Sequence, residues 1–471
     1  MIVKEARPYV IDNLKYALNP SSIAVVGASR YPSKVGNAVI RELLEWGYAG
    51  KIYPVNPRAD EVRGIKAYHT LREIKEPVDL VFIAVPAHVV NSIVHDAVAI
   101  KAKMAVISTS AFKEIGRGDL QDNITEYLRK NELPLIGPNL VGLGTPYAHF
   151  NCGFIPYLPI KGPVAMISQS GANLLAALGT SQENHFGMSF FVGLGNKADV
   201  DFCEFIEYAN QDPNTKCLAI YIEGLDSPEA FVKSCQKVSK PVVVIKVGGS
   251  KIGVKAAFAH TASENPNGDE FYDKIIRDAG AIRAQTWQEF LDDALALGHQ
   301  PPLMGDHVVM VTNGGGAGLL SCDHFERRGL PLHELAEISP MLQQRIRAYM
   351  PMFGSPLNPV DISGTANEIQ YKGAFQQAFR DPNVDGVLGA ICPTAITDVN
   401  AVANAAIEVY DSCKDLGKPF VMICQGGGEC HDAIMKLRDH GIPAYATAEQ
   451  AVNAMVALYQ YGQKVAKSAA K

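Results

Sequence analysis

A histidine among small residues is the first candidate for chemistry in this chain. His260 lies in Ala256-Ala257-Phe258-Ala259-His260-Thr261-Ala262-Ser263, soon after an apolar run, Val242 to Gly249, that ends in glycines. A large charged group can approach an imidazole that has no bulky polar neighbours, which suits a histidine that accepts a phosphoryl group as a covalent intermediate. The alternative is a half-buried loop histidine, one of twelve histidines in the chain. The rest of the sequence has to decide between these two readings.

A turn and a carboxylate further along could serve such a histidine. The turn Ser168-Gln169-Ser170-Gly171-Ala172 follows an apolar run and opens a helix. N–H groups and hydroxyls at a helix start can hold a phosphate, so Ser168, Ser170, Gly171 and Ala172 are predicted to bind phosphate. Glu223 ends another apolar run, and its carboxylate could accept the N–H of an imidazole and fix the tautomer. The alternative for Glu223 is a surface residue at a turn.

A nucleotide site is predicted near the N-terminus. Gly27-Ala28-Ser29 follows the first apolar run, but the full G-x-G-x-x-G pattern is absent because the next glycine is Gly36. Asn56 and Arg58 stand where an NAD site would have an acidic residue. These residues suit a nucleotide with an extra phosphate, such as the 3′-phosphate of coenzyme A, although NADP stays open. Further strand ends with small residues that leave room for this ligand are Val85-Pro86 and Ser108.

The elements that must position these residues alternate between short apolar runs and helix-like segments. This order is typical of α/β folds with parallel sheets, in which ligands bind beyond the carboxyl ends of the strands. Two prolines interrupt the pattern in Gly298-His299-Gln300-Pro301-Pro302-Leu303, which we interpret as a linker. The sequence predicts three α/β domains, near residues 1–150, 151–297 and 304–471.

The composition of the chain argues against several classes of function. The chain has 471 residues, 47% of them hydrophobic and 20% charged, as in ordinary globular proteins. A net charge of −6 argues against a general nucleic-acid binder. The nine cysteines form no C-x-x-C pair, which predicts no metal site and fits a reducing cytoplasm. We see no signal peptide and no apolar stretch of about 18 residues, so neither export nor a membrane span is expected.

An ordered set of motifs resembles one family over nearly the whole length. The chain is similar to the α subunit of the ADP-forming (nucleoside-diphosphate-forming) acyl-CoA synthetases, relatives of succinyl-CoA synthetase. The motifs are Val26-Gly27-Ala28-Ser29, Tyr53-Pro54-Val55-Asn56-Pro57, Gly137-Pro138-Asn139, Ser168-Gln169-Ser170-Gly171, Gly195-Asn196-Lys197-Ala198-Asp199-Val200-Asp201, Asp212-Pro213-Asn214-Thr215-Lys216, Ile222-Glu223-Gly224, His260-Thr261, Thr312-Asn313-Gly314-Gly315 and Asn358-Pro359-Val360-Asp361.

The resemblance implies a fold and a reaction. It implies a CoA-binding Rossmann-like domain that includes Asn139, a ligase domain with the phosphohistidine, and a second flavodoxin-like ligase domain, all with mainly parallel sheets. The implied enzyme is an acid–thiol ligase that interconverts acyl-CoA, ADP and phosphate with acid, CoA and ATP. Phosphate would form an acyl phosphate, and His260, supported by Glu223, would pass the phosphoryl group to ADP.

The family also implies a partner. Its ADP/ATP and Mg²⁺ bind an ATP-grasp domain, for which we find no candidate here, so a separate β subunit and an α2β2 hetero-oligomer are expected. The small residues that flank His260, together with Gly248, Gly249, Gly253 and Gly268, are consistent with a loop that swings between sites. The chain departs from the family pattern at Ala259 and Ala262, where serine and glycine are usual, in a longer following stretch, and at Leu140, where cysteine is usual.

Two other hypotheses remain at this point. One is a CoA-binding regulatory subunit without catalysis, which would have no need of both Glu223 and His260. The other is an NADP-dependent oxidoreductase, for which the G-x-G-x-x-G pattern is missing. The acid that forms the thioester is not identified by the sequence.

Overall fold

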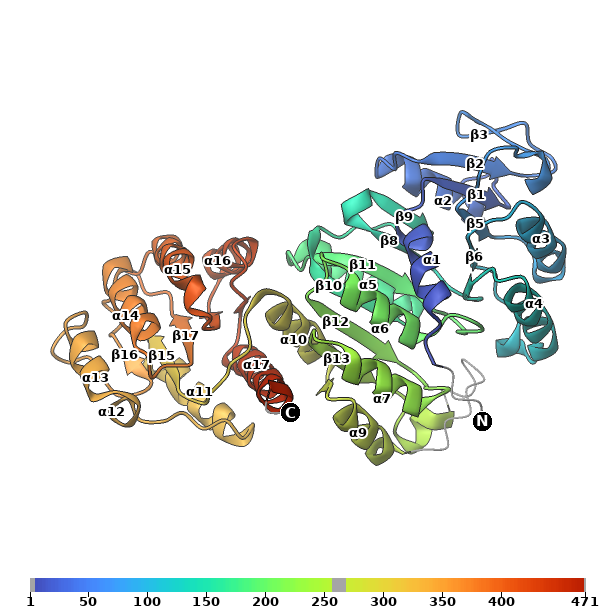
Figure 1. Cartoon of the computed structure of the whole chain (residues 1–471). Helices are drawn as coiled ribbons and strands as arrows, with labels where there is room; N and C mark the ends of the chain where they lie inside the picture. The colour runs from blue at the N-terminus through green and yellow to red at the C-terminus, as the bar shows by residue number, and fades with distance from the viewer. Residues whose placement is uncertain (1–4, 256–267, 470–471) are drawn as a thin grey trace. The chain divides into compact units, whose positions relative to one another are not determined.

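The structure is a computed structural model of the chain, and it describes residues 5–255 and 268–469 (Figure 1). His260 therefore lies outside the described residues. The described chain divides into two compact units, Met1–Arg283 and Ala284–Lys471. The first unit contains two large sheets and the second unit contains one. The three domains predicted from the sequence stay a prediction, because the boundaries at residues 150 and 297 are not tested by this division.

The first sheet is wholly parallel and is blue in Figure 1. Its strands are fully apolar in their central members and buried on both faces, as expected where helices cover a parallel sheet. In sheet order they are β2 (Lys51–Val55), β1 (Ser22–Val26), β5 (Leu80–Ile83), β6 (Met104–Ile107) and β7 (Leu135–Ile136). The connecting helices are α2 (Val35–Glu45), α3 (Ala87–Ala99) and α4 (Gly118–Lys130), with short elements β3 (Glu61–Val62), β4 (Ile65–Lys66), η1 (Leu71–Glu73) and η2 (Lys113–Ile115).

The second sheet is mixed. Its parallel strands carry the predicted phosphate turn and Glu223 at their carboxyl ends, whereas β8 and β9 join it antiparallel. The order is β14 (Ile282–Ala284), β13 (Val242–Lys246), β12 (Cys217–Ile222), β10 (Lys161–Ser168), β11 (Met188–Gly193), β8 (Gly142–Thr145) and β9 (Phe150–Gly153). The associated helices are α1 (Pro8–Leu18), α5 (Gly171–Glu183), α6 (Phe202–Gln211), α7 (Pro228–Lys237) and α9 (Asp269–Asp278), with η3 (Pro146–Ala148) between β8 and β9.

The third sheet forms the centre of the second unit and is again parallel. Its order is β16 (Val360–Asp361), β15 (Val308–Thr312), β17 (Gly386–Ile391), β18 (Phe420–Cys424) and β19 (Ala444–Tyr445). Its helices are α10 (Trp287–His299), α11 (Gly315–Arg327), α12 (Leu335–Ile338), α13 (Pro340–Arg347), α14 (Glu368–Arg380), α15 (Val399–Cys413), α16 (Gly428–Asp439) and α17 (Ala448–Ala469), with η4 (Lys414–Leu416). The predicted α/β class with several mainly parallel sheets is confirmed, with the mixed second sheet as the exception.

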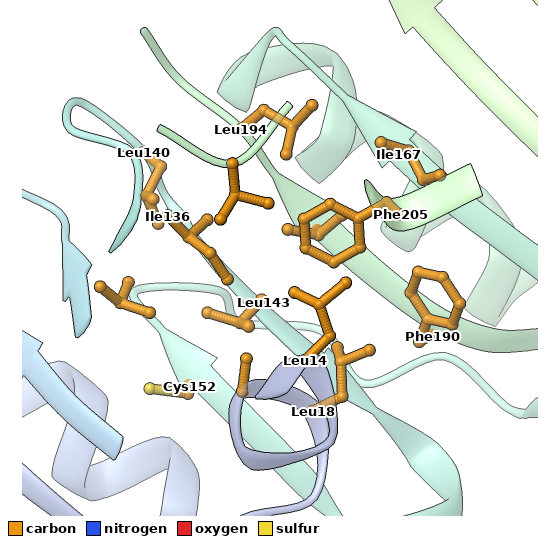
Figure 2. Packing of buried hydrophobic residues seen from close by; sticks show 14 of the residues in the cluster. Leu14, Leu18, Ile136, Leu140, Leu143, Cys152, Ile167, Phe190, Leu194 and Phe205 are labelled. Carbon is orange, nitrogen blue, oxygen red and sulfur yellow. The ribbon is translucent and has the colours of Figure 1, made fainter. Parts of the chain in front are cut away.

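One hydrophobic core joins the first and second sheets. Figure 2 shows Leu14 and Leu18 of α1 in the same cluster as Leu143 of β8 and Phe190 of β11. All four side chains are at most 2% exposed. Burial of this much apolar surface is the main favourable term in folding, so the two sheets hold each other in place. The elements that carry the candidate residues are thereby fixed relative to one another within residues 5–255 and 268–283.

A buried carboxylate, Asp199, makes hydrogen bonds that connect separate parts of this unit. Asp199 accepts hydrogen bonds from Arg7 and Arg129, both at 2.6 Å, and from the backbone N–H of Leu135 at 3.1 Å. Burial of a carboxylate is tolerated where charged partners and N–H groups satisfy its oxygens. Arg7 precedes α1 and Arg129 lies in the last turn of α4, so Asp199 connects the N-terminal segment, α4 and the loop after β11.

Candidate functional site

The first predicted ligand turn lines a cavity at the carboxyl edge of the first sheet. The cavity has a volume of about 880 Å³ and includes Gly27, Ser29, Asn56, Arg58, Val85 and Pro86. Ala28, also predicted here, is fully buried and does not line it. Gly27 has a φ of +90°, and a Cβ at this position would collide with the backbone carbonyl oxygen of Ala84. Only glycine therefore fits this turn.

The start of a helix and two positively charged side chains line this cavity together. The second glycine, Gly36, packs directly on the Gly27 carbonyl, so α2 begins at the cavity wall. Asn56 is fixed by its own contacts: its amide donates to the Ala28 carbonyl and its side-chain oxygen accepts from the Arg58 N–H at 2.8 Å. Arg58 and Lys34 bring positive charge. A phosphate-rich ligand fits such an arrangement of N–H groups and cations.

A second cavity, of about 380 Å³, adjoins the first through shared lining residues Val35, Ala84 and Val85. It contains two further predicted residues, Ser108 and Asn139, from the first sheet. It also contains Gly171 of the predicted phosphate turn from the second sheet. The structure thus brings part of the predicted CoA set and part of the predicted phosphate set to one cavity, although they are far apart in the sequence.

The loops around the second cavity hold each other through polar contacts. Ser108 donates to the Leu140 carbonyl at 2.9 Å, and the Asn139 side chain donates to Asn196 at 3.2 Å. Asn196 in turn donates to Glu114 at 2.7 Å. Hydrogen bonding from Asn196 and from the backbone N–H groups of residues 111, 112 and 114 outweighs burial and lowers the pKa of Glu114. The carboxylate therefore stays ionised and fixes the rim.

The predicted phosphate turn has the expected helix start. Ser170 is the N-cap of α5, and its hydroxyl accepts the N–H of Asn173 at 3.4 Å. The Ser168 hydroxyl donates to the Ser170 carbonyl at 2.8 Å and is almost fully buried, so it shapes the turn from within. Gly171 faces the cavity, whereas Ala172 is exposed on the first turn of the helix.

Glu223 lies one strand away and is tied to the phosphate turn. Gln169 accepts the backbone N–H groups of Glu223 at 2.9 Å and of Gly224 at 3.1 Å. Glu223 is 6% exposed, which contradicts the surface alternative raised from the sequence. The nearby Tyr221 has a raised pKa of about 12. The main cause is burial, and the second is the negative charge of Glu223. His260 lies outside the described residues, so its position relative to Glu223 stays a prediction.

Several residues at these cavities were not predicted. The first cavity also includes Lys34, His69, Thr70 and Asp96, and the second includes Thr109, Phe154, Gln169 and Asn196. Gln169 and Asn196 stand inside motifs that the sequence analysis quoted. Gln169 directly follows β10 and Asn196 comes three residues after β11, and this position could have singled them out, since polar residues near the carboxyl ends of parallel strands face the edge where ligands bind.

Two negative findings concern the described residues. No helix within residues 5–255 and 268–469 is long and apolar enough to cross a membrane. In the same part of the chain no group of three or more histidine, cysteine, aspartate or glutamate side chains could hold a metal ion. The described cysteines, all nine, are free thiols.

Known families match each part of the chain. The CoA binding domain matches residues 21–145, the succinyl-CoA ligase like flavodoxin domain matches residues 161–297, and the Ligase-CoA domain matches residues 308–469. Together these three domains define a CoA ligase. The confirmed class is therefore that of an acid–thiol ligase, and neither an oxidoreductase nor a purely CoA-binding protein is supported.

Full-length relatives specify the family. The chain is 37% identical to the α subunit of acetate–CoA ligase (ADP-forming) I of Pyrococcus furiosus, over 97% of this chain and 99% of that one. It is 34% identical to the α subunit of enzyme II of that organism, over 96% and 98%. Acetyl-coenzyme A synthetase 1 of Ca. Korarchaeum cryptofilum, "dinucleotide forming" and solved with phosphate and ADP, matches with a TM-score of 0.91 and 36% identity, over 97% and 98%. The chain belongs to the α subunits of the ADP-forming acid–CoA ligases, which confirms the resemblance drawn from its motifs.

Proposed function

We propose that this chain, with a partner subunit, interconverts acyl-CoA, ADP and phosphate with a small organic acid, CoA and ATP. The observation that carries the proposal is the second cavity, where Ser108 and Asn139 of the CoA-binding half meet Gln169 and Gly171 of the phosphate turn. A thioester that enters from the first cavity would end beside a bound phosphate. Bringing two reactants together in this way removes much of the entropic cost of their reaction.

The first cavity fits coenzyme A. The Gly27 turn lets the backbone approach closely, the starts of α2 and α3 offer N–H groups, and Arg58 and Lys34 offer charge for phosphates. We assign the nucleotide end to Gly27, Ser29, Asn56 and Arg58, and the pantetheine arm to the wall at Val85 and Pro86. The thiol end would reach Ser108 and Asn139, while Ala28 supports the turn from below.

The proposed chemistry proceeds in three transfers. A phosphate oxygen held by the turn at Ser168, Ser170, Gly171 and Ala172 attacks the thioester carbon; the carbon–sulfur bond breaks, and CoA leaves as its thiol. The resulting acyl phosphate gives its phosphoryl group to a nitrogen of His260 and releases the acid. Phosphohistidine then transfers the group to ADP. N–H dipoles at the start of α5 would stabilise the negative charge on the phosphoryl oxygens, and Glu223 would support the imidazolium.

The nucleotide site is assigned to a partner. The name of each P. furiosus relative describes a subunit alpha, and the chain spans only 63% of the length of the acetate–CoA ligase (ADP-forming) of Methanocaldococcus jannaschii. These facts support a second polypeptide for this chain. We propose a β subunit with an ATP-grasp domain that binds ADP and Mg²⁺, assembled as α2β2 in the cytoplasm.

Phosphoryl labelling tests the proposal. The complex with the partner subunit is incubated with γ-labelled ATP, and we expect an acid-labile, base-stable label on this chain. The label should disappear in His260→Ala and persist in His431→Ala, a matched change at an exposed histidine of α16. CoA and acid should discharge the label. A wild-type chain that binds CoA but takes no label would refute the phosphohistidine.

A further inference from the structure

Two apolar side chains on opposite strands of one hairpin line the second cavity. They are Val141 and Phe154, which flank the paired residues Gly142 of β8 and Gly153 of β9 (Figure 1). The Phe154 N–H donates to the Val141 carbonyl at 3.1 Å, which continues the pairing by one residue on each strand. A Cβ on Gly153 would collide with the same carbonyl, so the strands approach as closely as glycine allows. We call Val141 and Phe154 the apolar wall.

The inner part of the apolar wall packs on the turn that we propose to bind phosphate. A Cβ built on Gly171 would lie 2.5 Å from Cγ1 of Val141, and a Cβ built on Gly193 of β11 would lie 3.5 Å from its Cγ2. The Val141 side chain therefore occupies the space that these two glycines leave free. A group that reacts with a phosphate held at Gly171 has to lie against Val141.

The reacting carbon of a thioester has little freedom in this cavity. Under the proposed function the thiol end of CoA reaches Ser108 and Asn139 on one side, and phosphate is held at Gly171 on the other. The attacking oxygen and the thioester carbon must approach to about 3–3.5 Å before they react. The acyl chain on that carbon is thereby placed next to Val141, which contacts the same turn.

The other apolar or polar residues of the cavity are less suited to an acyl chain. Val35 and Val85 are shared with the first cavity and so lie where the CoA arm would enter. Thr109 is polar, and its hydroxyl donates to the Val85 carbonyl at 2.7 Å. Leu140 is 4% exposed and belongs to the hydrophobic core between the two sheets. The apolar surface that remains for an acyl chain is that of Val141 and Phe154.

The outer part of the apolar wall is an aromatic ring at the rim of the cavity. Phe154 is 37% exposed, so part of its ring is free to contact a ligand. Binding sites for small molecules are lined mainly by such apolar and aromatic side chains, and covering them removes apolar surface from water. The ring can therefore contact the carbons of an acyl chain that extend beyond Val141.

We propose that the apolar wall contacts the acyl group and determines which acids react. This inference rests on the proposed function. Val141 restricts branching at the carbon next to the reacting carbon, because its side chain lies against Gly171. Phe154 contacts the outer carbons of the chain. One methyl or methylene group in an apolar pocket changes kcat/KM by a factor of about 10–200, so two such residues are enough to select unbranched acids with a short apolar chain.

Val141→Ala tests the inner part of the apolar wall. The complex with the partner subunit is given CoA and ATP, and ADP release is measured with two isomeric acids, 2-methylpropanoate and butanoate. We expect the ratio of kcat/KM for the branched acid to that for the straight acid to rise about tenfold over wild type, because the methyl groups that oppose the branch are removed. Val232→Ala, at a half-buried valine of α7 that does not line the cavity, should keep the wild-type ratio.

Phe154→Ala tests the outer part, and it keeps the test open if Val141→Ala does not fold. The ratio of kcat/KM for hexanoate to that for acetate should fall about tenfold, because only the longer chain reaches the ring. Tyr157→Ala is the matched control, since Tyr157 is also 37% exposed but packs against Gly179 of α5 and does not line the cavity. A ratio between two acids is unaffected by changes in CoA binding, phosphate binding or the fraction of folded enzyme.

Failure of the apolar wall and failure of the proposed function are distinguishable. Wild type that releases no ADP in response to CoA with any of these acids would refute the proposed function. The apolar wall is then still tested by binding, because the dissociation constants of the complex for 2-methylpropanoyl-CoA and butanoyl-CoA should shift in favour of the branched thioester in Val141→Ala. Wild-type ratios in both Val141→Ala and Phe154→Ala would overturn the assignment of the wall.

Discussion

The side-chain oxygen of Gln169 accepts the backbone N–H of Glu223 at 2.9 Å, and the N–H of Gly224 at 3.1 Å. One neutral side chain thereby holds the end of β12 against the turn after β10 that we propose to bind phosphate. All three residues are buried. The relationship explains how a carboxylate proposed to support a histidine keeps a fixed distance from a proposed phosphate site.

Gln169→Leu should loosen this connection. Two buried N–H groups would lose their acceptor, which costs about 1–3 kcal/mol each, so we expect a loss of roughly 2–6 kcal/mol in the free energy of unfolding. Urea unfolding measures this loss, and labelling of His260 should slow in parallel. Gln236→Leu is the control, because Gln236 makes an exposed contact to the Asp278 carbonyl. Unchanged stability and labelling in Gln169→Leu would contradict the assigned role.

Gly171→Ala should weaken phosphate binding. A Cβ at Gly171 would lie 2.5 Å from Cγ1 of Val141, so either the turn or the cavity wall must move. We expect phosphate to bind about tenfold more weakly, since a small displacement misaligns the N–H groups. Gly179→Ala in the same helix meets only the Tyr157 ring, at an ordinary 3.5 Å, and should leave phosphate binding unchanged. Calorimetric titration with phosphate compares the two variants.

Arg58→Gln tests which phosphate the first cavity recognises. If Arg58 contacts the 3′-phosphate of CoA, the variant should bind CoA about tenfold more weakly, as expected for loss of one charge-assisted contact. Its affinity for dephospho-CoA should stay that of wild type. Lys66→Gln removes a positive charge on β4 that does not line the cavity, and it serves as control. Equal losses for both ligands would place the 3′-phosphate elsewhere.

Asp292→Asn should stabilise the second unit at neutral pH. Burial raises the pKa of Asp292 from 3.8 to about 6, although Gln450 and Gln288 donate to its oxygens. The folded chain therefore binds more protons than the unfolded chain between about pH 4 and pH 6, and stability falls as the pH rises through this window. Above it the ionised group costs roughly 2–3 kcal/mol.

The measurement is the free energy of unfolding of wild type and Asp292→Asn between pH 4 and pH 7. We expect the variant to gain stability at pH 7 and to lose this part of the pH dependence, because the amide does not ionise. Asp306→Asn, at a half-exposed carboxylate, is the comparison. A parallel pH dependence in Asp292→Asn and wild type would contradict the assignment to Asp292.

Local sequence predicted several residues that line the first cavity. Gly27, Ser29, Asn56 and Arg58 each stand within three residues of the end of an apolar strand, and the carboxyl ends of parallel strands share one edge of the sheet. The Ser170 cap and the start of α5 follow from the same local pattern. The Ala28 side chain is buried in the core and does not line the cavity, and its predicted role in binding the cofactor stays a prediction.

Tertiary structure decided how the separate edges combine. Strands β8 and β9 join the second sheet antiparallel, through pairing of Leu143 with Val192, and no alternation in their glycine-rich sequences announces it. Local sequence likewise gives no sign of the hydrogen bond that the Glu223 backbone N–H donates to Gln169, or of the close approach of Gly249 to Asp269.

The sequence by itself determined the class of fold, the family and the residues at the strand ends, because these depend on patterns within a few neighbouring residues. Only the tertiary structure decided that Ser108, Asn139 and Gly171 share a cavity and that Lys246 lies over Tyr272. Such contacts depend on the order of strands in the sheets and on packing between distant segments, which local spacing does not encode.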